Sequence, residues 1–141
     1  MTSSPPSTVI RVMVADDHPV IHSGLDGLFF ADAQITVVGI ATDFDSLLAQ
    51  LPTAPIDVLI LDLMNMGAGP ITMVRELRSL YPDIRILVFS SSLSLATELL
   101  NVGALGYVVK QEKLNHLPAA IRAVAAGQSY VSPLVRERQE R

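Results

Sequence analysis

The sequence predicts a doubly wound α/β domain built around a five-stranded parallel sheet. Five short runs rich in Val, Ile and Leu recur along the chain, and segments of helical periodicity separate them. The runs are continuous rather than alternating, which is typical of strands covered by helices on both faces. Strand and helix in regular alternation, joined by short connections, form a parallel sheet with right-handed crossovers. At 141 residues the chain has the length of one such domain.

The five predicted strands are the apolar runs themselves. They cover residues 9–15, 35–39, 56–61, 84–89 and 105–109. Each run has the length of an ordinary strand and is too short to cross a membrane.

The five predicted helices cover residues 19–30, 45–51, 71–81, 94–102 and 114–126. Pro52 and Pro82 come just after the second and third helices, and Gly103 and Gly127 come just after the fourth and fifth. Proline cannot continue a helix, and glycine readily adopts the left-handed conformation that ends one. These four residues therefore mark the expected helix ends.

The two ends of the chain differ from the middle in composition. Residues 1–8 are rich in Ser, Thr and Pro and lack the basic and apolar regions of a secretory signal, so we expect a disordered leader. The folded domain is then expected over residues 9–127. Residues 128–141 lose the apolar period and gain mixed charge, which predicts a linker or the start of an interdomain helix toward an effector domain outside this chain.

Composition argues against several classes of function. The chain contains no apolar run of about 18 residues and no secretory signal, so we expect a cytoplasmic domain without a membrane segment. It has no cysteine, which excludes thiol chemistry. Its formal net charge of -4 argues against binding a nucleic-acid backbone without a further domain, because such binding needs a clustered Lys and Arg surface.

Polar residues follow four of the five predicted strands. Asp16 and Asp17 follow the first strand, Asp62 the third, Ser90 the fourth and Lys110 the fifth. In an open α/β sheet, ligands bind beyond the carboxyl ends of the strands. Each residue alone has an ordinary structural interpretation, as a helix cap, a turn residue or a solvated charge. Together, three carboxylates at neighbouring strand ends repel one another unless a cation lies among them.

The cation that these ligands favour is Mg²⁺. Carboxylate and carbonyl oxygens suit Mg²⁺, which also accepts phosphate oxygens as ligands. Asp62 is then placed to attack phosphorus as an aspartate nucleophile, and Lys110 is the candidate cation that contacts the transferred group. His18, next to the acids, is interpreted as a solvated loop residue, because Mg²⁺ prefers oxygen.

The motifs VMVADDHPVIHSGL, DVLILDL, ILVFS and GALGYVVK resemble, in order and spacing, the signatures of bacterial response-regulator receiver domains. The resemblance covers about residues 10–127. The first and last motifs are similar to the NarL/FixJ subgroup, whose receivers precede a LuxR-type helix-turn-helix. The resemblance implies a CheY-like, flavodoxin-like three-layer sandwich with strand order 2-1-3-4-5.

The resemblance also implies roles for individual residues. Asp62 is the phosphoacceptor, Asp16 and Asp17 are the acidic pair around Mg²⁺, Met64 supplies a backbone carbonyl to the metal, and Lys110 contacts the phosphate. Ser90 matches the switch hydroxyl and Tyr107 the switch aromatic, which together remodel the face formed by the fourth helix, the fifth strand and the fifth helix.

The same resemblance implies partners and an output. They are a sensor histidine kinase, a homodimer on activation, and DNA bound only through a helix-turn-helix domain outside this chain. The domain is then a phosphoacceptor in a two-component system and not an enzyme, apart from self-catalysed phosphorylation and autodephosphorylation.

The sequence departs from the family pattern in two loops. After the third strand it has DLMNMGAGP, so Met66 replaces the usual proline and Pro70 stands at a later glycine. Between Ser90 and Lys110 the chain is roughly two residues shorter than usual, and we expect residues 91–94 to carry the difference. Loss of proline predicts a less rigid loop beside Asp62.

Two alternatives remain open from the sequence. A pseudo-receiver would keep the fold and act as a phosphorylation-independent protein-interaction module, which the unusual loop after Asp62 allows. A phosphatase of the haloacid-dehalogenase type also uses an aspartate at a strand end, but it needs a second acid two residues further on, where this chain has Met64.

Overall fold

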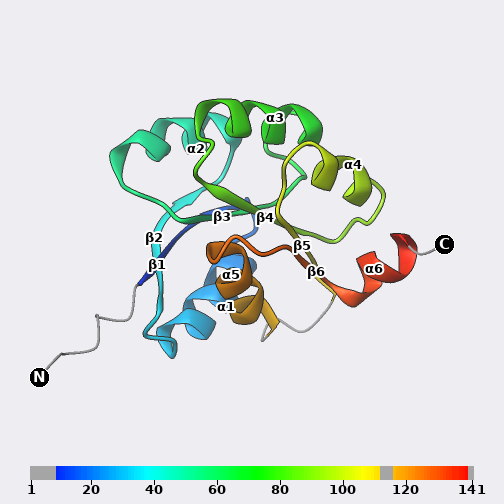
Figure 1. Ribbon diagram of the computed structural model, residues 1–141. Coiled ribbons are helices and arrows are strands. Elements are labelled where there is room, and N and C mark those ends of the chain that lie inside the picture. Colours follow the sequence, from blue (N-terminus) through cyan, green and yellow to red (C-terminus); the bar gives the residue numbers. More distant parts are fainter. Residues whose placement is uncertain (1–8, 112–115, 140–141) are drawn as a thin grey trace, which may run out of the picture.

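Strands and helices alternate along the chain in the computed structural model, which describes residues 9–111 and 116–139 (Figure 1). The strands are β1 (Ile10–Ala15), β2 (Ile35–Ala41), β3 (Val58–Leu61), β4 (Arg85–Ser90), β5 (Gly106–Val109) and β6 (Tyr130–Val131). The helices are α1 (Pro19–Phe30), α2 (Phe44–Gln50), the short 3₁₀ helix η1 (Leu51–Thr53), α3 (Pro70–Leu80), α4 (Ala96–Asn101), α5 (Leu117–Ala125) and α6 (Pro133–Gln139).

The strands form one parallel sheet in the order β2-β1-β3-β4-β5-β6. The expected order of the first five strands is confirmed, but the expected number of strands is wrong. The sixth strand pairs Tyr130 with Gly106 and Val131 with Tyr107. A strand of two residues is too short to show a hydrophobic period, which is why the sequence pattern did not predict it.

Part of the segment after α5 packs against the sheet, while the interpretation of residues 128–141 as a linker or the start of an interdomain helix stays a prediction. Val135 on α6 is fully buried in the same core cluster as Tyr107. Ser132, also buried, accepts a hydrogen bond from the backbone N–H of Val109 at 3.3 Å. The expected leader at 1–8 and the last two residues lie outside the described residues.

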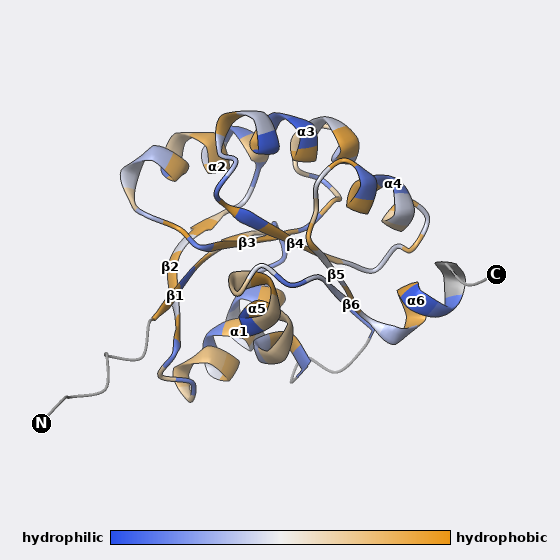
Figure 2. Cartoon of the chain, in the orientation of Figure 1, coloured by the Kyte–Doolittle hydropathy of each residue, from blue (hydrophilic) through white to orange (hydrophobic). Residues whose placement is uncertain are grey.

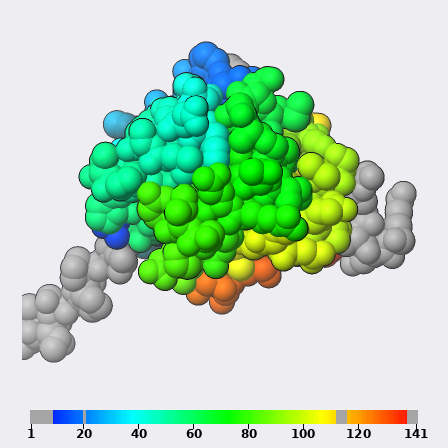
Figure 3. Space-filling model, turned by 90° about the horizontal axis from the view of Figure 1, so that it is seen from above, coloured from blue at the N-terminus to red at the C-terminus, as the bar shows by residue number. Residues whose placement is uncertain are grey.

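Helices cover both faces of the sheet, and the sheet divides the core into two layers. Helices α1 and α5 lie on one face and α2, α3 and α4 on the other (Figure 1). The strands between them are strongly apolar, whereas the helices carry hydrophilic stretches as well (Figure 2). Seen from above, the chain from α2 through α3 to α4 forms a continuous surface, in cyan, green and yellow (Figure 3). β3 and β5 are buried along their whole length and β1 and β4 along most of it, which explains their unbroken apolar runs, whereas β2 at the edge alternates.

The helices begin at residues that the local chemistry favours. Asp43 caps α2, and its Oδ1 accepts a hydrogen bond from the N–H of Ser46 at 2.7 Å. Helix α1 begins at Pro19 with His18 as its N-cap residue, and no side chain caps it. Asp17 therefore does not cap this helix.

The predicted helix ends at glycine are confirmed. Gly103 and Gly127 have φ angles of 126° and 82°, which L-residues with a side chain rarely adopt. A Cβ atom on Gly103 would lie 2.7 Å from Cγ of Arg78, so the absence of a side chain also makes room for that arginine. Both glycines thus end a helix and turn the chain toward the next strand.

The loop between β3 and α3 is anchored at Met66. The Met66 side chain is 1% exposed, and its backbone carbonyl accepts a hydrogen bond from the N–H of Phe44 at 2.8 Å. Its neighbours Asn65 and Gly67 both have positive φ angles, 59° and 84°, which turn the chain so that Met66 points inward. The loop therefore replaces the rigidity of a proline with burial and a long-range hydrogen bond.

Helix α4 is shorter than the predicted range of 94–102. Ser94 lies outside it, where its backbone N–H and its hydroxyl both contact the hydroxyl of Ser92, at 3.2 and 2.9 Å. Such serine hydrogen bonds compete with helical ones and delay the start of the helix.

Candidate functional site

The carboxyl ends of β1, β3 and β5 bring three of the predicted site residues together. Ala15 pairs with Leu61, so the residues that follow them, Asp16 and Asp62, lie at neighbouring strand ends. Lys110 follows β5, on the far side of β4 from these residues. Its Nζ lies 2.9 Å from Asp16 Oδ2 and 3.4 Å from Asp62 Oδ1. The two aspartates are 1% and 2% exposed. The predicted clustering of these residues is thus present in the fold.

The Lys110 ammonium lies over the ring of Phe89 on β4. Its Nζ is 5.5 Å from the ring centroid, a distance at which a cation is attracted to the ring face. The lysine side chain is only 14% exposed. Its charge is therefore directed at the acids and not at solvent.

The two buried aspartates have opposite electrostatic environments. Burial raises the pKa of Asp16, but hydrogen bonds from Lys110 and His18 outweigh it, and the net effect lowers the pKa. Burial also raises the pKa of Asp62, and the Asp16 carboxylate raises it further, while Lys110 opposes both effects without cancelling them. Lys110 therefore stabilises mainly the negative charge of Asp16, and the charge of Asp62 is stabilised less.

Two carboxylate oxygens in the cluster have no hydrogen-bond partner among the described residues. They are Asp17 Oδ1 and Asp62 Oδ2, and both atoms are buried. An unpaired buried carboxylate oxygen is costly. The donor set of Asp16, Asp17, His18 and Asp62, with one ligand atom from each lying within 4.8 Å of the others, fits a divalent cation that would satisfy these oxygens.

One histidine, His18, lies within this acidic cluster, and a second, His22, contacts only the backbone beside it; the contacts of neither were predicted from the sequence. Nδ1 of His18 lies 2.6 Å from Asp16 Oδ1 and 3.2 Å from Asp17 Oδ1. One helical turn further along α1, Nε2 of His22 contacts the backbone carbonyl of Asp16. His18 lies in the loop before α1 with its side chain 45% exposed, so it is partly solvated as expected, and it also contacts the acids.

Ser90 and Tyr107, the predicted switch residues, are both fully buried. Ser90 Oγ accepts a hydrogen bond from the N–H of Ser92 at 3.1 Å, and the Tyr107 hydroxyl donates to the Ser92 carbonyl. Burial raises the pKa of Tyr107, so its hydroxyl remains a donor. The two residues are thus joined through the loop that follows β4.

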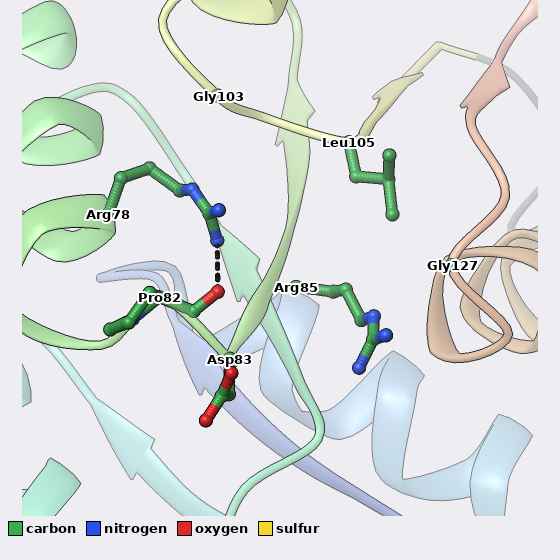
Figure 4. Close-up of a pocket in the computed structure, with 7 residues that line it drawn as sticks. All are labelled: Arg78, Pro82, Asp83, Arg85, Gly103, Leu105 and Gly127. Atoms are coloured by element: carbon green, nitrogen blue, oxygen red, sulfur yellow. Dashed lines mark hydrogen bonds between the residues drawn. The ribbon is translucent and has the colours of Figure 1, made fainter.

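A separate hollow of about 260 Å³ opens at the opposite end of the strands, where β4 and β5 begin. It is lined by Arg78, Pro82, Asp83, Arg85, Gly103, Leu105 and Gly127 (Figure 4). Arg78 donates to the carbonyls of Pro82 and Ile84, at 2.8 and 3.1 Å, and so closes the connection between α3 and β4. The hollow contains none of the predicted site residues.

Comparison with known proteins agrees with the geometry. The signature of the response regulator receiver domain matches residues 12–122. The chain is 37% identical over 123 residues to the DNA-binding transcriptional activator DevR/DosR of Mycobacterium tuberculosis, covering 86% of this chain but only 57% of that protein. The chain therefore spans little more than half the length of that relative.

Solved structures show the same fold. A LuxR-family response regulator from Aurantimonas superposes with a TM-score of 0.85 at 30% identity, over 92% of this chain and 94% of that one. The isolated receiver domain of RcsB from Salmonella enterica serovar Typhimurium, solved with the phosphomimetic BeF₃⁻, gives 0.83 at 27% identity, over 92% and 98%. No helix among the described residues is long and apolar enough to span a bilayer. The sequence match, the fold and the strand-end acids together establish that this chain belongs to the response regulator receiver domain family.

Proposed function

We propose that Asp62 is the phosphoacceptor of this receiver domain and that its phosphorylation controls an effector. The observation that carries the proposal is the buried Asp62 carboxylate, which lies 3.4 Å from the Lys110 ammonium and keeps one oxygen, Oδ2, without a hydrogen-bond partner among the described residues. A carboxylate held in this way has a free lone pair directed at the strand-end cluster, which is what an attacking nucleophile needs.

In the proposed reaction, a carboxylate oxygen of Asp62 attacks the phosphorus of a phosphohistidine on a sensor histidine kinase. The O–P bond forms as the N–P bond breaks, and the histidine of the kinase leaves as neutral imidazole after taking up a proton. Lys110 Nζ, already close to Asp62 Oδ1, contacts an oxygen of the transferred group and offsets its negative charge. Ser90, at the end of β4, supplies the hydroxyl that approaches the phosphoryl group.

The residues around Asp62 also fit Mg²⁺, which is the metal we propose for this site. Asp16, Asp17 and Asp62 supply carboxylate oxygens, and Met64 supplies a backbone carbonyl while its side chain stays 54% exposed. Bound there, Mg²⁺ offsets the charge of the carboxylates and of the phosphoryl oxygens.

The proposed output is transcription control through a DNA-binding domain beyond this chain. Support comes from the relatives, since DevR/DosR is described as a DNA-binding transcriptional activator and RcsB has been solved in complex with DNA. Tyr107 connects Asp62 chemistry to the surface of α4, β5 and α5, because it is buried on β5 and bonded to the loop after Ser90. Phosphorylation would change that surface and promote a homodimer.

Phosphorylation is tested by incubating the chain with acetyl phosphate and Mg²⁺ and measuring intact mass. We expect the gain of one phosphoryl group in the wild type and no gain in Asp62→Asn. Beryllofluoride with Mg²⁺ should change the amide NMR spectrum of residues near Asp62, Ser90 and Lys110. A wild-type protein that neither gains mass nor responds to beryllofluoride is a pseudo-receiver, and the proposal is then wrong.

A further inference from the structure

The His18 imidazole lies inside the acidic cluster and not beside it. Its Nδ1 is 2.6 Å from Asp16 Oδ1, 3.2 Å from Asp17 Oδ1 and 3.5 Å from Asp62 Oδ2. No other nitrogen among the described residues approaches all three acids in this way, since Lys110 contacts only Asp16 and Asp62.

The spacing of these atoms resembles that of ligands around one ion. Adjacent ligands at bond lengths of about 2.1 Å and right angles are about 3.0 Å apart. The three distances from His18 Nδ1 bracket this value. The His18–Asp16 contact of 2.6 Å would have to lengthen by about 0.4 Å to reach this value, and the His18 side chain is 45% exposed.

An independent observation points to a cation at the same place. Asp62 is 2% exposed, and its Oδ2 has no hydrogen-bond partner among residues 9–111 and 116–139. That oxygen faces His18 Nδ1 at 3.5 Å, beyond hydrogen-bonding distance for a strong contact. Asp17 Oδ1 likewise has no hydrogen-bond partner among the described residues, although it lies 3.2 Å from the same nitrogen. Histidine alone does not satisfy either oxygen, whereas an ion bound by all four residues does.

We propose that His18 is a nitrogen ligand of the cation in this site and that it shifts the preference of the site from Mg²⁺ toward first-row transition dications such as Co²⁺ and Mn²⁺. The proposal rests on the proposed function, because it assumes the same cation site. Imidazole nitrogen binds these borderline ions well and Mg²⁺ poorly. Coordination through Nδ1 displaces the proton there, which moves to solvent from a charged imidazole or to Nε2 in a neutral one.

The test compares Co²⁺ with Mg²⁺ in the 141-residue chain and in two variants, His18→Ala and His22→Ala. The second variant is a matched control, since it removes an imidazole one helical turn away whose contact is with the Asp16 backbone and not with the acids. By calorimetry we expect His18→Ala to lose about tenfold in Co²⁺ affinity and less than about twofold in Mg²⁺ affinity. His22→Ala should keep the wild-type ratio of the two affinities.

Proton NMR of the Co²⁺-loaded protein gives a second, direct reading. A histidine bound through Nδ1 carries its remaining proton on Nε2, and the paramagnetic ion moves that exchangeable signal far outside the normal range. We expect the signal in the wild type and in His22→Ala, and its loss in His18→Ala.

The outcomes separate this proposal from the proposed function. Equal losses of Co²⁺ and Mg²⁺ affinity in His18→Ala, or a shifted signal that survives this substitution, would overturn the role of His18 as a ligand. The Mg²⁺-dependent response of Asp62 to beryllofluoride would then still stand. If instead neither metal binds and Asp62 does not respond, the cation site itself is wrong.

Discussion

At the scale of single residues, the cluster combines charges that the fold would not tolerate without compensation. Lys110 compensates the charge of Asp16 more fully and that of Asp62 only in part, although the two carboxylates occupy neighbouring strand ends. The difference arises because Lys110 donates its hydrogen bond to Asp16 at 2.9 Å. Asp62 thus remains available for chemistry, at a cost in stability.

Asp62→Asn should therefore stabilise the metal-free protein at neutral pH, by on the order of 1 kcal/mol. Burial and Asp16 raise the pKa of Asp62 in the folded state, so the folded state binds its proton more tightly than the unfolded state does. The contribution of wild-type Asp62 to stability consequently falls as pH rises from the ordinary aspartate range through the raised pKa.

Urea unfolding of both proteins across this pH range measures the effect. The difference should shrink as pH falls below the ordinary pKa of aspartate, where both states are protonated, and Mg²⁺ should stabilise only the wild type appreciably. A variant that is less stable than the wild type at neutral pH without metal would contradict this account.

At the scale of elements, the ends of helices and the loops after strands are fixed by a few residues with specific geometry. Gly103 ends α4 with φ of 126° and lies against the stem of Arg78. Met66 holds the β3–α3 loop by burial and by its hydrogen bond from Phe44. Gly103 thus fixes a turn at the amino ends of the strands, and Met66 fixes a loop at their carboxyl ends.

Gly103→Ala should destabilise the domain by about 1–3 kcal/mol, because alanine is strained at this φ and its Cβ would collide with Arg78. Gly27→Ala is the matched control, since a Cβ on that helical glycine meets nothing within 4 Å. We expect the control to gain about 0.5–1 kcal/mol from helix propensity. Thermal unfolding of the two variants should shift in opposite directions, and a shift in the same direction would disprove the role of Gly103.

Met66→Ala should cost about 2–5 kcal/mol, since it empties a fully buried site in the core. Met64→Ala, two residues away and 54% exposed, should change stability by less than about 0.5 kcal/mol. Hydrogen exchange at the Phe44 amide, which bonds to the Met66 carbonyl, should speed up only in Met66→Ala. Unchanged protection at Phe44 in that variant would show that the loop is held by other contacts.

At the scale of the whole molecule, β6 and α6 pack against the elements that precede them. Strand β6 extends the sheet beside β5, and α6 inserts Val135 into the core that contains Tyr107. Tyr107 is thereby flanked by residues from β6 and α6.

Val135→Ala should lower the free energy of unfolding by about 2 kcal/mol, because the side chain is fully buried. Leu134→Ala, at the neighbouring position that is 41% exposed, should have a small effect. Urea unfolding provides the comparison. Equal stability of Val135→Ala and the wild type would mean that α6 does not contribute to the fold.

The alternation of strand and helix, and the strand-end positions of Asp16, Asp62 and Lys110, could be predicted from the amino-acid sequence. Both depend on local information, since periodicity reports which faces are buried and the carboxyl ends of parallel strands share one edge. The order of the first five strands followed from the family resemblance and is confirmed by the sheet.

Three features could be seen only in the folded protein. His18 lies among the acids, Met66 anchors its loop, and β6 extends the sheet while α6 packs against it. Each depends on contacts between residues far apart in the chain, such as Met66 with Phe44 and Tyr130 with Gly106. A two-residue strand has no period, and one histidine or methionine has the same local pattern whether buried or exposed. Their positions are set by the packing of elements around them, which the order of residues along the chain does not display.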